Sequence, residues 1–251
     1  MKKILLFGSQ GLLGQELTFL LSDNFEIVPL SHFHVGIEDF EGVEEIITEM
    51  KPDIIINAVG AHSLPEQGRR FSEDKIHNAN TVGAVNIALI CSEQNIQFIH
   101  FSCASAIHPQ DIIGETKEAA EKQIIHISKE SGWKNFEIIR LGIICGGDED
   151  VFIKSLQKML KEKNIIIYDN GQKSLSSVEN IHKHIESALL SPGTGNIESI
   201  CFSGTMNLEE MFQVLSEEGR EYKKENAIDV PFVLESTIDS GSLEDYFKMR
   251  D

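Results

Sequence analysis

Short apolar runs alternate with segments of helical period along most of the chain. Between the runs, apolar residues recur at helical spacing, as at Val43, Ile46, Ile47 and Met50. This alternation is typical of βαβ units, so the sequence predicts an α/β fold with a doubly wound, mainly parallel sheet. The runs predicted as strands are residues 3–8, 25–30, 53–58, 97–102, 136–140, 165–168 and 197–202.

Two of the predicted helices begin with residues that suit a capping box, in which side chains satisfy the free N–H groups of the first turn. Asn207 and Glu210 begin a helix with a clear apolar stripe. Ser176 and Glu179 predict the start of another, which ends near residues 191–193.

The best domain boundary is the acidic, glycine-bearing stretch at residues 146–150, after which the alternation becomes less regular. We therefore predict a nucleotide-binding domain over residues 1–147 and a small C-terminal lobe over 148–251, part of which returns to the main sheet. Beyond residue 219 the pattern suggests only a short helix near 243–249.

The strongest motif is a glycine triplet, Gly8, Gly11 and Gly14, between the first strand and the first helix. At this spacing the first glycine allows a sharp turn, the second lets the backbone approach a pyrophosphate, and the third lets the helix pack closely on the sheet. The free N–H groups and dipole of the helix N-terminus would hold the phosphates. The motif predicts dinucleotide binding.

The spacing is GxxGxxG rather than GxGxxG, and in this it resembles the extended short-chain dehydrogenase/reductases. Residues 51–58, 80–88, 138–140 and 169–171 are similar, in order and neighbourhood, to the dTDP-4-dehydrorhamnose reductase-like family. The resemblance extends from residue 3 to about residue 215. It implies a Rossmann-type fold, NAD or NADP as cofactor, a nucleotide sugar as ligand, and a place in deoxysugar or surface-polysaccharide biosynthesis.

The resemblance also implies a set of cofactor-binding residues. Asn80 would bend the helix backbone behind the active site; the alternative is an ordinary asparagine on a helix surface. The other implied contacts are Gly8, Gly11, Leu12, Leu13 and Gly14 at the pyrophosphate, Asn57, Ala58 and Val59 beside the riboses, and Lys117 at the nicotinamide ribose.

The end of the second strand departs from the NAD-binding pattern. NAD enzymes place a carboxylate there to bond the ribose 2′-hydroxyl, whereas this chain has Ser31 and His32 and no acid in the segment 28–32. A missing carboxylate removes a repulsion against a 2′-phosphate, although no arginine attracts one. We predict a slight preference for NADP, with Ser31 near the ribose.

Enzymes of this superfamily use Ser or Thr, Tyr and Lys, with Tyr and Lys one helical turn apart. Lys117 is present, but Ile113 stands where the Tyr belongs. Cys103 occupies the Thr position, and Ser105 is the hydroxyl that can replace it. The segment 106–111 is also short, so we expect the family's substrate-covering insertion to be missing.

The proton source is therefore open. The three tyrosines, Tyr168, Tyr222 and Tyr246, all lie in the C-terminal part, and Tyr168 is expected to be a packing residue. His108 is the best substitute acid, against the alternative of an exposed loop histidine. The acids Glu115, Glu118 and Glu121 are interpreted as a solvated helix face.

The charge balance limits the partners. With 22 Lys and Arg against 40 Asp and Glu, the net charge is −18, which argues against nucleic acid or an anionic membrane as a partner. A small phosphate ligand stays compatible, since backbone N–H groups can hold it. No apolar run reaches the about 18–20 residues of a membrane helix, and the run after Lys3 is too short for a signal peptide.

The four cysteines show no short spacing, and we interpret them as reduced thiols in a cytoplasmic protein without a metal site. The His pairs at 32/34 and 182/184 do not change this, because the second pair falls on a predicted helix where i and i+2 face different sides. Superfamily members commonly pair through helices, so a homodimer is compatible with the resemblance.

Three hypotheses follow. The first is a sugar-nucleotide 4-keto reductase or close relative, with Lys117 at the ribose, Ser105 or Cys103 near the carbonyl, and an atypical proton source. The second is a catalytically inactive NAD(P)- or nucleotide-sugar-binding regulatory protein with a protein partner, favoured by Ile113. The third, the weakest, is a scaffold that has lost its ligands.

Overall fold

The computed structural model describes residues 1–61, 71–147, 154, 166–169, 171–215, 223–226, 241–243 and 246. The chain forms two compact units. The first consists of Met1–Arg140 and His182–Glu198, and the second of Leu141–Ile181 and Ser199–Asp251. Each unit is described by itself.

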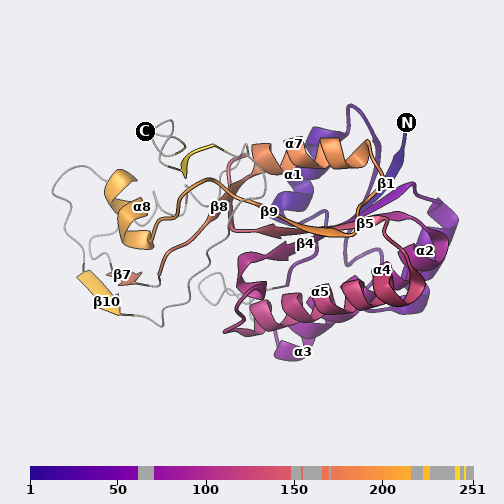
Figure 1. Cartoon of the computed structure of the whole chain (residues 1–251), viewed down its shortest axis with the longest axis horizontal. Helices are drawn as coiled ribbons and strands as arrows, with labels where there is room; N and C mark the ends of the chain where they lie inside the picture. The colour runs from indigo at the N-terminus through magenta and orange to yellow at the C-terminus, as the bar shows by residue number, and fades with distance from the viewer. Residues whose placement is uncertain are drawn as a thin grey trace. The chain divides into compact units, whose positions relative to one another are not determined.

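The first unit is built on a six-stranded sheet in the order β2-β1-β3-β4-β5-β9 (Figure 1). The pairs β1–β2, β1–β3 and β3–β4 are parallel. Each strand predicted from the sequence is present within two residues of its expected bounds, so the predicted fold class is confirmed. The strands of this sheet are β1 (Lys3–Phe7), β2 (Glu26–Leu30), β3 (Ile54–Asn57), β4 (Gln97–Cys103), β5 (Phe136–Leu141) and β9 (Asn196–Ile200).

Helices cover both faces of the sheet (Figure 1). One face carries α1 and residues 182–189 of α7, and the other carries α2, α4 and α5. The helical elements are α1 (Leu12–Leu21), α2 (Phe40–Met50), α3 (Glu73–His77), the π-helical turn η2 (Asn78–Val82), α4 (Gly83–Gln94), the 3₁₀ turn η3 (Ala104–Ala106), α5 (Ile112–Ser131) and α7 (Val178–Leu189).

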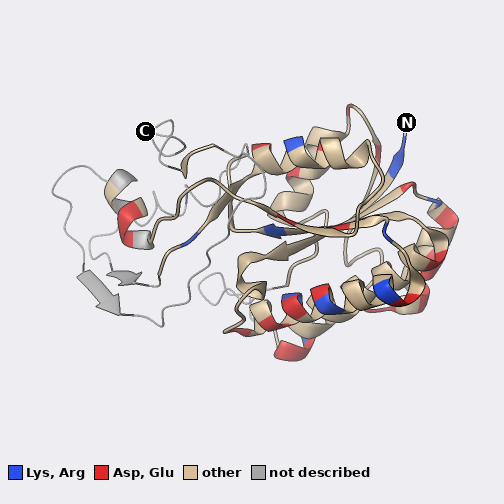
Figure 2. Cartoon of the chain, in the orientation of Figure 1, with Lys and Arg blue, Asp and Glu red and all other residues tan. Residues whose placement is uncertain are grey.

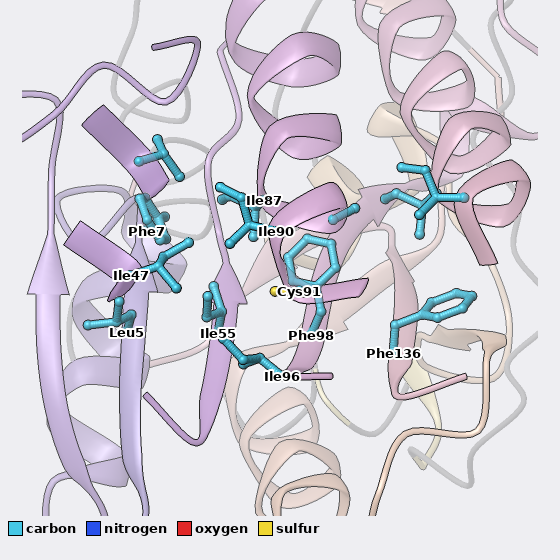
Figure 3. Close-up of a cluster of buried hydrophobic side chains, with 14 of the residues drawn as sticks. Leu5, Phe7, Ile47, Ile55, Ile87, Ile90, Cys91, Ile96, Phe98 and Phe136 are labelled. Atoms are coloured by element: carbon cyan, nitrogen blue, oxygen red, sulfur yellow. The ribbon is translucent and has the colours of Figure 1, made fainter. Parts of the chain in front are cut away.

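One hydrophobic core of the first unit lies between the sheet and α2, α4 and α5 (Figure 3). Leu5, Ile55 and Phe98 from three neighbouring strands meet Ile47 of α2 and Ile87 of α4, and all five are fully buried. Since parallel strands covered on both faces are buried throughout, their sequences are continuous apolar runs rather than alternating ones.

The chain order fixes where a ligand binds in such a sheet. From β1 the chain adds β2 on one side and then β3 on the other, so the strand order reverses between β1 and β3. Ligands of open parallel sheets bind outside the carboxyl ends of the strands at this reversal. The glycine triplet follows β1 directly and therefore lies at this point.

The second unit contains two short parallel pairs. β6 (Ile143–Cys145) pairs with β8 (Leu175–Ser177), and β7 (Ile166–Asp169) pairs with β10 (Lys223–Asn226). Its core contains Cys145, Leu175, Phe202, Met211 and Tyr246 among others. The last helix of the described part is α8 (Leu208–Leu215), and most of the helix predicted near 243–249 lies outside the described residues.

The capping box predicted at α8 is confirmed. The Asn207 N–H donates to Glu210 Oε2 at 2.7 Å, and the Glu210 N–H donates to Asn207 Oδ1 at 2.8 Å. The box predicted at Ser176 is wrong by one residue. Ser176 lies in β8, where its hydroxyl bonds Gly142 and Ile200, and Ser177 accepts the Asn180 N–H at the start of α7 instead.

Acidic residues on α2 and α5 account for part of the negative charge (Figure 2). On α2, Glu41, Glu44, Glu45 and Glu49 are exposed, whereas Val43 and Ile47 are buried. No helix in the described part of the chain combines the length and apolar character that a membrane span requires.

Candidate nucleotide-binding and active site

The loop after β1 is held tightly against the ends of two other strands. Gly8 has φ +83°, and a Cβ there would lie 2.6 Å from the carbonyl carbon of Ala58, just after β3. The N–H groups of Gly8 and Ser9 both donate to the Leu30 carbonyl at the end of β2, each at 3.1 Å. Glycine is therefore required at position 8 both for the backbone conformation and for the close approach.

The helix that follows offers its N-terminus without a side-chain cap. Gly11 is the N-cap of α1, and no side chain there accepts a hydrogen bond from the first turn. A Cβ at Gly14 would lie 2.2 Å from the Gly8 carbonyl oxygen, so the helix crosses the loop in direct contact. The amides of Leu12 and Leu13 thus begin an uncapped helix at the sheet's reversal point, an arrangement suited to phosphate.

Ser31, just after β2, is hydrogen-bonded to His34. Its N–H donates to Nδ1 of His34 at 3.1 Å, and its hydroxyl lies at the same distance from that nitrogen. Because Nδ1 accepts, the neutral His34 ring carries its proton on Nε2. The sequence reasoning overlooked this contact, for which the Ser-x-x-His spacing was the available signal.

Lys117 lies deep in the site, on α5. Its ammonium donates to the Val59 carbonyl at 3.0 Å and to the Phe101 carbonyl at 2.8 Å, and the residue is 6% exposed. Burial lowers the pKa of Lys117 to about 8, an effect that electrostatic interactions with Cys103 and Glu121 partly offset. The side chain is therefore a cation that titrates close to neutral pH.

Cys103 and Ser105 form a pair beside the first turn of α5. The Cys103 Sγ lies 2.9 Å from the Ser105 Oγ. A Cβ at Gly114 would lie 2.7 Å from the Ser105 carbonyl oxygen, so the helix rests directly on the turn that carries this hydroxyl. Ile113 is half-buried, one helical turn before Lys117.

His108 is exposed in the short connection 107–111 between η3 and α5. His108, the substitute acid suggested by the sequence, therefore has no hydrogen-bonding partner in the described part of the chain. The loop itself is only five residues long.

Asn80 links the turn after β3 to α5. It lies in the π-helical turn η2 and is buried. Its side chain accepts from the Ala61 N–H at 2.8 Å, and it donates to the Ala61 carbonyl at 3.0 Å and to the Thr116 hydroxyl at 3.2 Å. The alternative interpretation, an asparagine on a helix surface, is wrong.

Glu121 is also not the solvated residue that the sequence suggested. It is 2% exposed and accepts two hydrogen bonds from the Arg140 guanidinium, Nε–Oε1 at 2.9 Å and Nη2–Oε2 at 2.5 Å. The Ser102 hydroxyl adds a third, at 2.6 Å. Glu121 lies one turn after Lys117 and so shares its inward face, a spacing that the sequence already contained. Glu118, in contrast, forms a surface pair with Lys122 at 2.8 Å.

The described cysteines and histidines are not gathered into a ligand cluster. Cys91, Cys145 and Cys201 are buried, Cys103 is half-buried, and none of the four forms a disulfide. The Nε2 of His182 lies 3.7 Å from the Glu186 carboxylate and has no hydrogen bond among the described residues, whereas the Nε2 of His184 is hydrogen-bonded to Glu137. In the part of the chain that the structure describes, no three His, Cys, Asp or Glu side chains are placed to hold a metal ion.

Residues 1–175 match the family described as RmlD substrate binding domain. The dTDP-4-dehydrorhamnose reductase of Escherichia coli K12 is 28% identical over 241 residues, which cover 86% of this chain and 78% of that enzyme. The enzyme of the same name from Aggregatibacter actinomycetemcomitans is 25% identical over 182 residues and 66% of this chain. The chain spans 60% of the length of that relative and of the one from Shigella flexneri.

Solved structures agree in fold. The dTDP-4-dehydrorhamnose reductase of Bacillus anthracis, in complex with NADP, superimposes with a TM-score of 0.82 at 16% identity, covering 99% of this chain and 98% of that one. A UDP-glucose 4-epimerase from Thermotoga maritima, solved with UDP-glucose, gives 0.77 at 17% identity and covers 98% and 96%. Several activities therefore use this fold.

Proposed function

The chain belongs to the RmlD substrate binding domain family, and we propose that it binds NADP(H) or NAD(H) together with a nucleotide sugar and acts as a 4-keto reductase-like protein of deoxysugar or surface-polysaccharide biosynthesis. One observation carries the proposal. The uncapped N-terminus of α1 lies at the reversal between β1 and β3, where Gly8 and Gly14 leave no room for a side chain.

The residues present fit a dinucleotide. The amides at Gly11, Leu12, Leu13 and Gly14 would hold the pyrophosphate, consistent with a chain of net charge −18 that binds phosphate through its backbone. The turn formed by Asn57, Ala58 and Val59 would border the riboses. Asn80 stabilises the chain just after that turn through two hydrogen bonds with the Ala61 backbone.

NADP is the favoured cofactor. No carboxylate stands in the segment 28–34, so nothing there repels a 2′-phosphate. The Ser31–His34 contact leaves the ring proton of His34 on Nε2, where it is a hydrogen-bond donor suited to phosphate. NAD is the alternative, because the segment contains no arginine.

A reduced nicotinamide would supply the hydride for a carbonyl carbon. Lys117 would hold the nicotinamide ribose, and the Cys103–Ser105 pair would hydrogen-bond the carbonyl oxygen. Ile113 has no proton to give, so the proton must come from this pair or from solvent. A missing general acid costs about 10²–10⁴ in rate, so we expect slow turnover.

The second candidate is a non-catalytic NAD(P)- or nucleotide-sugar-binding protein, and Ile113 is the observation that favours it. The two candidates share the binding residues and differ only in turnover. Both require that the chain bind a nicotinamide dinucleotide.

The test is a titration of the protein with NADPH and with NADH by calorimetry, followed by absorbance at the nicotinamide band with a dTDP-4-keto-6-deoxy sugar. We expect binding of both, tighter for NADPH, and slow oxidation. Ile113→Tyr is expected to raise kcat by about tenfold or more, since it restores a phenol one turn from Lys117.

Ile112→Tyr is the matched control, because it places the same phenol about 100° away around the helix. If the native chain binds the dinucleotide without turnover, and Ile113→Tyr shows no turnover either, the protein is the non-catalytic candidate. No binding of either dinucleotide would exclude both.

The affinity for NADPH is expected to depend on pH through Lys117. The side chain is protonated below its pKa of about 8 and neutral above it. Because the ammonium would bind the ribose, affinity should be full below this pH and should fall as the pH rises through it. Calorimetric titrations across the range measure the midpoint, and Lys117→Met should bind weakly with no such midpoint. A midpoint that persists in Lys117→Met would assign the titration to another group.

A further inference from the structure

His100 is a buried titratable residue that the proposed function leaves without a role. It lies on β4 between Phe98 and Ser102, and it is 0% exposed. Burial lowers the pKa of His100 well below its usual value, and the positive charge of Lys117 lowers it further. The ring is therefore neutral at physiological pH.

Neighbouring hydrogen bonds fix which ring nitrogen carries the proton. The Val59 N–H donates to Oδ1 of Asn57 at 3.0 Å, which orients the amide so that Nδ2 faces His100. Asn57 Nδ2 lies 3.2 Å from His100 Nδ1 and must donate to it. The proton of the ring is then on Nε2, which is buried and has no partner in the described part of the chain.

The same short network supports Lys117. Asn57 holds the N–H of Val59, and the carbonyl of Val59 accepts from the Lys117 ammonium at 3.0 Å. A second acceptor, the Phe101 carbonyl, directly follows His100 in the chain. An ammonium has three N–H groups, so the two carbonyls hold it while one N–H stays available to a ligand.

A purely structural role for His100 is a poor explanation. A buried donor without a partner destabilises the fold, and an apolar side chain at this position would avoid that cost. Asn57 is 1% exposed, and its amide group is hydrogen-bonded to His100 and to the Val59 N–H. Both polar side chains are thus committed to the Val59 turn.

We propose that Asn57 and His100 are positioning residues for Lys117: His100 orients the Asn57 amide, and Asn57 fixes the Val59 turn whose carbonyl holds the ammonium. The role in ligand binding rests on the proposed function; the arrangement itself does not. The other charged or titratable groups around Lys117 are Cys103 on β4 and Glu121 on α5, the latter paired with Arg140 of β5.

The arrangement is tested first without a ligand. In ¹⁵N spectra of the native chain, His100 is expected as a neutral ring with the proton on Nε2 throughout the neutral range. The ¹³Cε signal of Lys117, assigned by its absence in Lys117→Met, should titrate near pH 8. A His100 that is protonated on Nδ1, or charged at neutral pH, would overturn the proposal in the native protein, with no variant needed.

Variants then test whether the titration midpoint of Lys117 and the affinity for NADPH depend on the hydrogen bond between Asn57 and His100. His100→Leu removes the acceptor, whereas His100→Gln keeps an oxygen that Asn57 can donate to. We expect His100→Leu to lower the Lys117 midpoint by about one pH unit, because the ammonium is less well solvated, and to weaken NADPH binding about tenfold, a loss of about 1.4 kcal/mol. His100→Gln should restore most of both. Equal midpoints in the Leu variant and the native protein would overturn the proposal.

Asn57→Leu is the second variant and should reproduce the effect of His100→Leu. In the double variant the two losses should not add, because both break the same link. Asn86→Leu is the matched control. Asn86 is a buried asparagine of α4 whose amide donates to the Ile37 and Glu38 carbonyls, so its loss should lower the melting temperature and leave the Lys117 midpoint in place.

The experiments test dinucleotide binding and the positioning role of Asn57 and His100 independently. If the native chain binds no dinucleotide, the proposed function is wrong, while the Lys117 and His100 titrations still decide on the network. If NADPH binds and both leucine variants keep the native midpoint and affinity, the proposed function stands and the positioning role is wrong.

Discussion

Replacing Gly11 with valine is expected to weaken NADPH binding by about 100-fold or more, a change of about 2.8 kcal/mol, while the protein stays folded. Gly11 has φ −72° and ψ 164°, a conformation that any residue adopts, and an added Cβ would lie 3.3 Å from the Gly8 carbonyl oxygen, a small encroachment. The valine methyl groups would instead occupy the space that a pyrophosphate needs above the first turn of α1.

Gly14→Ala separates binding from folding. Its Cβ would lie 2.2 Å from the Gly8 carbonyl oxygen, which is backbone and cannot move aside without displacing the loop or the helix. This variant should lose both binding and several degrees of melting temperature, whereas Gly11→Val should melt close to the native protein. Calorimetric titration and thermal unfolding measure the two effects. An unchanged NADPH affinity in Gly11→Val would mean that the dinucleotide binds elsewhere.

Glu121→Ala is expected to cost about 3–5 kcal/mol of the free energy of unfolding. The carboxylate is nearly fully buried and accepts from Arg140 twice and from Ser102 once. Its hydrogen bond and charge together raise the pKa of Arg140, although partial burial acts in the opposite direction. Alanine would leave a partly buried guanidinium and a buried hydroxyl without their acceptor.

Glu118→Ala is the control for this prediction. Glu118 lies three residues earlier on the same helix, with 33% of its side chain exposed, and pairs with Lys122 on the surface. Exposed i,i+4 pairs contribute about 0.3–0.5 kcal/mol, so this variant should be nearly neutral. Urea denaturation of the two variants measures the difference. Equal losses would show that the Glu121–Arg140 pair does not stabilise the fold.

The fold was predictable because its signals are local. The six strands of the main sheet and β7 appear as apolar runs, and α2 and α8 repeat their apolar positions along one face. The short strands β6, β8 and β10 were not predicted, and β10 consists of polar residues. The glycine triplet was equally clear, since the positive φ of Gly8 and the close contact at Gly14 each require a residue without a side chain.

Charge on a helix was harder to interpret. Glu118 and Glu121 are both acids on α5, and the sequence pattern gave the same prediction for each. Glu118 faces solvent, whereas Glu121 faces β4 and β5. Helical spacing relates Glu121 to Lys117, yet which face of the helix is buried depends on what packs against it. The partner, Arg140, lies nineteen residues further along the chain.

By itself the sequence determined the α/β fold, the glycine loop and the replacement of the expected tyrosine by Ile113, because each depends on residues adjacent in the chain or one helical turn apart. The tertiary structure decided where the buried polar groups point. It turned Asn57 toward His100, placed Lys117 between two carbonyls, and joined Ser31 to His34. Most of these contacts join strands and helices distant in sequence, and a buried hydrogen bond exists only where packing brings donor and acceptor within reach.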